Sequence, residues 1–189
     1  AGKDVAQAKA TYPALLGLQG ARARLEQLAA SMRDALSPLG ADLIVSEGGY
    51  RFQPLLGYAV TMQGAAVALT QALSATAETT STATIGLEAR PHDALEVRPG
   101  QPLADVLMQV AQPFIDQTRA QAGVVETLTV DGVDAVAVEL TGELDGAPIG
   151  GRIIVAQPDA DRLFIAAGTA PLSTWEQEVA AALTHVLES

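Results

Sequence analysis

Residues 124–168 read VVETLTVDGVDAVAVELTGELDGAPIGGRIIVAQPDADRLFIAAG, and the predicted architecture starts from them. Apolar and polar residues alternate on both sides of Asp131-Gly132, and an Asp-Gly pair between two such runs indicates a type I′ hairpin. Asp145-Gly146 predicts a second turn, and the loop 158–161 leads into an apolar strand at 162–168. The stretch therefore predicts an antiparallel meander of successive strands.

The residues before the meander also predict strands. Residues 50–52, 58–62, 65–69 and 85–89 alternate apolar and polar side chains, as half-buried strands do. Residues 71–82 are rich in Ser, Thr and Ala and predict a surface loop between two of these strands.

Two helices are expected to pack on the sheet. After the Pro-rich run at 99–102, apolar residues share one helical face, with Pro113 kinking the helix or beginning its second half. Ser173 and Glu176 form an S-x-x-E capping box for a final helix, whose apolar face begins with Trp175. The order of elements predicts an α+β fold, with an antiparallel sheet covered by helices and preceded by an N-terminal helical segment.

The N-terminal segment differs from the rest in pattern and in charge. Apolar residues recur every seven positions after Pro13, which predicts an amphipathic helix from about Pro13 to Leu36. Residues 1–46 hold five basic and four acidic residues, whereas the remaining residues hold six arginines and 18 carboxylates. We therefore divide the chain into a helical leader, residues 1–45, and an acidic domain, residues 46–189.

Composition excludes several function classes. A net charge of −11 argues against a nucleic-acid partner, because the phosphates would repel the chain. No apolar run is long enough for a transmembrane span. The absence of cysteine removes thiolate catalysis, disulfides and zinc–thiolate sites, and no cofactor is expected.

Residues 1–42 resemble the C-terminal region of trans-isoprenyl diphosphate synthases, the family of farnesyl and geranylgeranyl diphosphate synthases. The match is carried by Gly2-Lys3-Asp4, by KATYPALLGL at 9–18 and by the Ala- and Arg-rich run that follows. In that family the lysine at the position of Lys9 helps to hold a substrate diphosphate. The D-D-x-x-D magnesium motifs of the family are missing, so the resemblance implies a fragment or fusion that is inactive as it stands.

Residues 48–189 resemble PsbP/Mog1-like domains, which occur in small bacterial lipoproteins and exported proteins. The resemblance is carried by GYRFQP at 49–54, GY at 57–58, VDG at 130–132, DG at 145–146, GRIIV at 151–155 and the run 164–175. It implies a binding or assembly scaffold rather than an enzyme. It also implies an extracytoplasmic or membrane-anchored protein whose signal has been removed, with a cytoplasmic location as the alternative.

Few residues are candidates for a metal site or for catalysis. Acidic loop residues could bind a hard cation such as calcium if they gather at one edge of the sheet, namely Asp131, Asp134, Glu143, Asp145, Asp159 and Asp161. The alternative, which leaves no metal site, is that these aspartates cap turns. His92 and His185 are expected to be solvated, and Arg152 is expected to pair across strands with Glu139.

The sequence thus predicts a non-enzymatic binding or assembly module with an unidentified protein or small-molecule partner. Its working surface would be an acidic sheet edge or the groove between the sheet and its helices. A structural subunit that docks or self-associates through residues 13–36 is an alternative, with Leu25, Leu28 and Met32 as contacts. Trp175 is expected to anchor the final helix, or to contact a partner if it is exposed.

Overall fold

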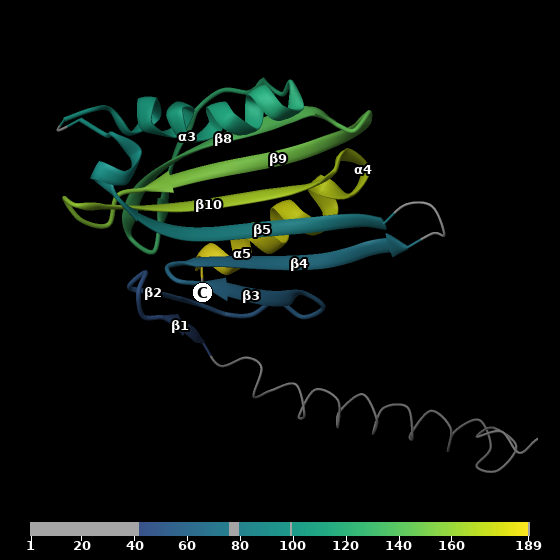
Figure 1. The fold of residues 1–189 in the computed structure, drawn as a ribbon, viewed down its shortest axis with the longest axis horizontal. Helices are drawn as coiled ribbons and strands as arrows, with labels where there is room; N and C mark the ends of the chain where they lie inside the picture. Colours follow the sequence, from purple (N-terminus) through teal and green to yellow (C-terminus); the bar gives the residue numbers. More distant parts are fainter. Residues whose placement is uncertain (1–41, 76–79, 99, 189) are drawn as a thin grey trace, which may run out of the picture. The chain divides into compact units, whose positions relative to one another are not determined.

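The computed structural model describes residues 42–75, 80–98 and 100–188. A sheet of eight antiparallel strands dominates them (Figure 1). In spatial order the strands are β3 (Ala59–Gln63), β4 (Ala66–Ala75), β5 (Thr80–Pro91), β10 (Arg162–Pro171), β9 (Ala147–Ala156), β8 (Val133–Leu144) and β6 (Gln121–Ala122), with β7 (Glu126–Val130) also paired to β8. A separate hairpin of β1 (Leu43–Val45) and β2 (Tyr50–Phe52) completes the strands of the described residues.

The predicted meander is confirmed. Strand β7 pairs with β8, β8 with β9 and β9 with β10, each antiparallel and in continuous register. Asp131 and Gly132 have φ of 47° and 76°, and Asp145 and Gly146 have φ of 51° and 79°. Positive φ at both central residues is the type I′ geometry, so each Asp-Gly pair turns the chain as its sequence predicts.

The predicted α+β class is wrong, because the described residues are predominantly β. Residues 71–75 and 80–82, expected in a loop, extend β4 and β5, which pair along most of their length. Thr is favoured in strands whereas Ala is not, so this mixed composition leaves the conformation to pairing with the neighbouring strands. The predicted N-terminal helical segment lies outside the described residues.

The helices of the described ranges are few. They are the 3₁₀-helix η2 (His92–Leu95), α3 (Leu103–Thr118) and a C-terminal run made of α4 (Leu172–Thr174), the π-helix η3 (Trp175–Val179) and α5 (Ala180–Glu188). The capping-box prediction is wrong: α4 begins at Leu172, has Pro171 at its N-cap and shows no side-chain cap hydrogen bond. Helix α3 continues through Pro113.

Two apolar layers cover the sheet. Strand side chains alternate between the faces, so one set on β8 and β9 packs against α3 and the next set packs on the opposite face. Val136, Val138, Ile153 and Val155 belong to the α3 cluster. Ala135, Ala137, Ile154 and Ala156 belong to the cluster with the C-terminal run and the β1–β2 hairpin. Figure 1 shows α3 along β8 and α5 behind the strands.

The β1–β2 hairpin includes residues that the sequence division assigned to the leader. Leu43 pairs with Phe52 and Val45 with Tyr50, and Val45 and Phe52 are both buried. None of the helices in the described part of the chain is long and apolar enough to cross a membrane.

Candidate functional site

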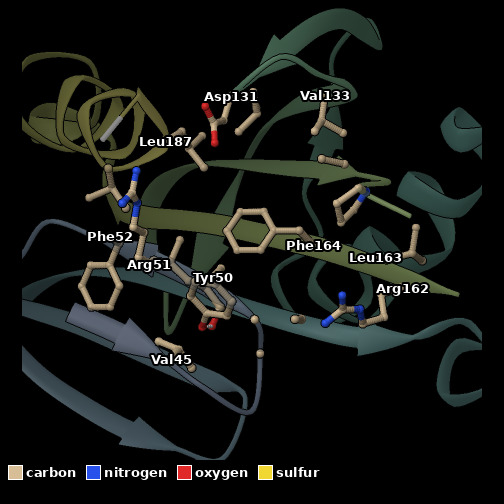
Figure 2. Close-up of a pocket in the computed structure, with 18 of the residues that line it drawn as sticks. Val45, Tyr50, Arg51, Phe52, Asp131, Val133, Arg162, Leu163, Phe164 and Leu187 are labelled. Carbon is tan, nitrogen blue, oxygen red and sulfur yellow. Dashed lines mark hydrogen bonds between the residues drawn. The ribbon is translucent and has the colours of Figure 1, made fainter. Parts of the chain in front are cut away.

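A cavity of about 650 Å³ lies beneath the β1–β2 hairpin. Its walls come from the hairpin, from β5, β10 and β9, from the β7–β8 turn and from the end of α5. The lining is mostly apolar and includes Val45, Phe52, Leu87, Val133, Phe164 and Leu187. Figure 2 shows Phe164 near the centre, with Tyr50, Phe52 and Val45 on one side and Leu187 and Asp131 on the other.

The turn of the hairpin gives the cavity one of its walls. The backbone N–H groups of Gly48 and Gly49 both donate to the carbonyl of Val45, at 3.1 and 2.8 Å. Gly49 has φ of 69°, a conformation that glycine adopts without a steric penalty. This tight turn aims Tyr50 and Phe52 at the sheet.

Tyr50 holds the hairpin on the sheet. Its hydroxyl lies 3.0 Å from the carbonyl oxygen of Ala65 and 3.1 Å from that of Leu87, and it donates its hydrogen to them. Its ring meets that of Phe164 edge to face, with centroids 5.1 Å apart. Burial raises the pKa of Tyr50 to about 12, and the Glu88 carboxylate adds to the rise. Tyr50 is therefore a neutral structural group in the cavity wall rather than a base.

Charged side chains stand at the rim of the cavity. Arg162 binds Asp159 through Nε at 2.9 Å and through Nη2 at 2.8 Å. The Nε of Arg51 lies 3.4 Å from a carboxylate oxygen of Asp42. Asp131 is the acidic residue of the lining. The site thus joins an apolar interior to a polar rim, the arrangement of small-molecule binding sites.

The acidic residues considered for a cation divide between the two ends of the meander. Because β8 pairs with β9 from Ala135–Ala156 to Leu144–Ala147, the turn at 145–146 lies at the opposite end of β9 from the turn at 158–161. Asp145 and Glu143 are thereby separated from Asp159 and Asp161. No group of three or more potential metal ligands gathers within the described ranges.

Asp159 instead organises its own turn. Its Oδ1 accepts backbone hydrogen bonds from Asp161 at 3.0 Å and from Arg162 at 2.8 Å. The hydrogen bond from the Arg162 side chain, together with these backbone bonds, lowers the pKa of the Asp159 carboxyl. This is the turn-capping role that the sequence left as the alternative to a metal site.

The other singled-out residues lie apart from the cavity interior. His185 is exposed on α5, whereas His92 is half-buried in η2 and its Nε2 has no hydrogen-bond partner within the described ranges. Trp175 is 3% exposed and anchors the C-terminal run to the core. Arg152 pairs with Glu139 across the strands at 3.7 Å, as expected, and also with Glu126 at 3.2 Å.

The leader residues Lys9, Leu25, Leu28 and Met32 lie outside the described residues. The predictions attached to them therefore stay predictions.

Of the residues that line the cavity, the sequence singled out Asp131 as a candidate for a cation site, but it did not identify the cavity or its two arginines. Arg51 and Arg162 are separated by more than half the described chain, and their elements meet because the β1–β2 hairpin packs on the sheet, where Tyr50 contacts Leu87 of β5 and Phe164 of β10. A local signal for part of the site does exist. The D-A-D-R run at 159–162 places an acceptor three residues before Arg162, the spacing of the ion pair that the structure forms.

Comparisons with known proteins support the fold alone. No protein-family model matches the chain, and no curated protein sequence matches it significantly. The chain is similar to LpqN, a protein involved in cell envelope biogenesis of Mycobacterium tuberculosis, with a TM-score of 0.51 and 10% identity over 72% of this chain and 78% of LpqN. At that identity the likeness shows a shared fold.

Two further structures are similar at a lower score. PA94 from Pseudomonas aeruginosa, a protein of unknown function, has a TM-score of 0.48 and 10% identity over 79% of this chain and 94% of its own. A protein from Bacteroides thetaiotaomicron has a TM-score of 0.48 and 9% identity over 80% of this chain and 47% of its own. The resemblances to PsbP/Mog1-like domains and to isoprenyl diphosphate synthases stay predictions.

Proposed function

We propose that residues 42–188 form a non-enzymatic binding module that takes an apolar ligand group into the cavity beneath the β1–β2 hairpin. One observation carries the proposal: about 650 Å³ of space is lined mainly by aliphatic and aromatic side chains and has a charged rim. Sites of this size and lining hold small molecules or single side chains of a partner.

Two titratable groups of the cavity, Tyr50 and Arg162, favour binding over catalysis. Tyr50 stays neutral at ordinary pH because burial raises its pKa to about 12, and its hydroxyl already bonds backbone carbonyls. Arg162 is engaged by Asp159. A general base needs a lone pair near the reacting group and a pKa near the working pH, and neither residue offers both.

An extracytoplasmic location is part of the proposal. It is supported by the resemblance of residues 48–189 to domains of exported proteins and by the fold shared with LpqN, which is involved in cell envelope biogenesis. Fractionation of cells that express the natural gene, with detection of the protein by antibody, tests this location. Recovery in the cytosolic fraction alone would contradict this part of the proposal and leave the binding site unaffected.

Binding of a neutral lipophilic dye tests the cavity itself. Ala89 lines the cavity on β5, so Ala89→Phe fills space that the dye needs. Ala59 is exposed on β3 and does not line the cavity, which makes Ala59→Phe the matched control. We expect dye fluorescence to be lost in Ala89→Phe and kept in Ala59→Phe. Equal binding by both variants, each folded by circular dichroism, would refute the site.

A further inference from the structure

The edge of the eight-stranded sheet at β3 is open within the described ranges. Strand β3 ends the sheet beyond β4, and no other strand of residues 42–75, 80–98 and 100–188 pairs with it (Figure 1). All five residues of β3 are exposed. None of them lines the cavity beneath the hairpin, so this edge is separate from the proposed binding site.

The backbone groups that face outward from this edge belong to Val60 and Met62. The N–H of Ala89 on β5 donates to the carbonyl of Ala65, at 3.3 Å. Successive residues of a strand direct their backbone groups to opposite sides, so the odd-numbered residues of β4 bond to β5 and the even-numbered ones bond to β3. The β3 partners of the even-numbered residues are Ala59, Thr61 and Gln63. Val60 and Met62 therefore direct their N–H and C=O groups away from β4, where a further strand would lie.

The apolar layer on one face of β4 is incomplete at β3. Val60 lies opposite Leu69 and Met62 lies opposite Val67, and directly opposed residues share a face of the sheet. Leu69 and Val67 are 0% and 3% exposed, whereas Val60 and Met62 are 36% and 49% exposed. A strand placed beside β3 would carry this layer one strand further and cover the side chains of Val60 and Met62.

This edge lacks the features by which proteins block strand pairing. Proteins protect an edge strand with charged side chains, proline or bulges, or by making the strand very short. Residues 52–77 hold no charged side chain, β3 holds no proline, and its register with β4 is continuous. At the opposite edge, by contrast, β6 has only two residues and β7 begins with Glu126, which pairs with Arg152.

A second copy of the chain fits the β3 edge. Copies of a chain with a net charge of −11 repel each other, and the repulsion is smallest where an uncharged strand meets another. A two-fold axis through Thr61 places two β3 strands antiparallel, with Val60 of each copy opposite Met62 of the other. Both of these pairs use the outward N–H and C=O groups, and both place their apolar side chains on the same face of the sheet. The edge is therefore complementary to itself.

We infer that the chain forms a two-fold dimer in which β3 pairs with β3 of a second copy, centred on Thr61, so that the two sheets join into one. This register pairs all five residues of β3, whereas a shifted register pairs fewer. The inference goes beyond the proposed function and does not depend on what the cavity binds.

A disulfide trap tests the register, because the chain has no cysteine of its own. In the dimer, Thr61 lies opposite Thr61 of the second copy at a non-hydrogen-bonded position, where the Cα atoms are about 4.5 Å apart and a disulfide can form. The full chain with Thr61→Cys is incubated with oxidised glutathione and run on a non-reducing gel. Val124→Cys is the control, since Val124 is 83% exposed between β6 and β7. We expect Thr61→Cys to form the covalent dimer roughly tenfold faster or more, because pairing holds the two thiols together.

Sedimentation equilibrium of the full chain, at up to about 500 µM, measures the association itself. Met62→Lys places a charge at the edge and should raise the dissociation constant roughly tenfold or more, because a two-fold axis repeats each lost contact. Val124→Lys makes the same change of charge away from β3 and should leave the dissociation constant unchanged. Met62→Pro removes an outward N–H while sparing the hydrogen bonds between β3 and β4, so it should also weaken the dimer.

Crosslinking of Thr61→Cys that is no faster than that of Val124→Cys would overturn the inference. A chain that stays monomeric at all these concentrations would also overturn it. So would a dimer that both Met62→Lys and Met62→Pro leave unchanged, provided that circular dichroism shows both variants to be folded.

Discussion

Replacing Gly150 with alanine tests the packing that anchors the C-terminal run to the sheet. A Cβ on Gly150 of β9 would stand 2.6 Å from Cγ of Trp175, 2.8 Å from its Cδ1 and 2.9 Å from its Cβ. Rotation of the Trp175 side chain moves Cγ and Cδ1 but leaves Cβ in place. The helix must therefore move away from the strand to admit the methyl group.

The change in the free energy of unfolding that Gly150→Ala causes combines two opposing effects. Adding a methylene-sized group to a packed core typically destabilises by about 1–3 kcal/mol. Alanine in a strand gains about 0.5–1 kcal/mol over glycine, because glycine loses more backbone entropy on folding. We expect Gly150→Ala to lower the free energy of unfolding by about 1 kcal/mol, near the middle of the difference between these terms.

Gly86 provides the matched control on β5. The nearest atom to a Cβ there is the carbonyl oxygen of Ala167 at 4.0 Å, an ordinary contact. Gly86→Ala should therefore raise the free energy of unfolding by about 0.5 kcal/mol. In urea unfolding with a slope of about 2 kcal/mol per molar, the midpoints of the two variants should differ by about 1 M.

The urea midpoints of these two variants can refute the packing of Trp175 on β9. If Gly150→Ala unfolds at the same urea concentration as Gly86→Ala, or at a higher one, then Trp175 does not pack on β9 as described. A double-mutant cycle adds a second test, since Trp175→Ala removes Cγ and Cδ1 and should reduce the penalty of Gly150→Ala.

Three further predictions concern stability and association. Because the pKa of Tyr50 is raised to about 12, its neutral form contributes stability that is complete below pH 10 and is lost as the pH rises toward 12. The free energy of unfolding of Tyr50→Phe, measured by denaturation at a series of pH values, should therefore fall less over this range than that of the unsubstituted chain. Gly142→Ala should destabilise more than Gly150→Ala, because its Cβ would lie 2.8 Å from the backbone oxygen of Thr118, and an equal urea midpoint would contradict this. In a chain that also carries Met62→Lys, Leu25→Glu with Leu28→Glu should abolish any remaining concentration-dependent association seen in sedimentation, and association that survives would exclude the leader stripe.

The local parts of the fold could be predicted because their signals act over a few residues. Each Asp-Gly pair supplies the positive φ that a type I′ turn requires, so the turn and the pairing of the two strands beside it can be read from a few residues. The apolar periodicity of residues 103–118 likewise identifies the face of α3 that packs on the sheet.

Long-range pairing decided the features that the sequence did not reveal. Residues 71–75 and 80–82 are rich in Ser, Thr and Ala, which predicted a loop, and they become strand because β4 and β5 pair with each other and β5 pairs with β10. The acidic turns lie at opposite ends of the meander because antiparallel strands alternate direction. The cavity exists only where the hairpin at 43–52 meets Phe164 and Leu187, contacts between distant segments that no local pattern encodes.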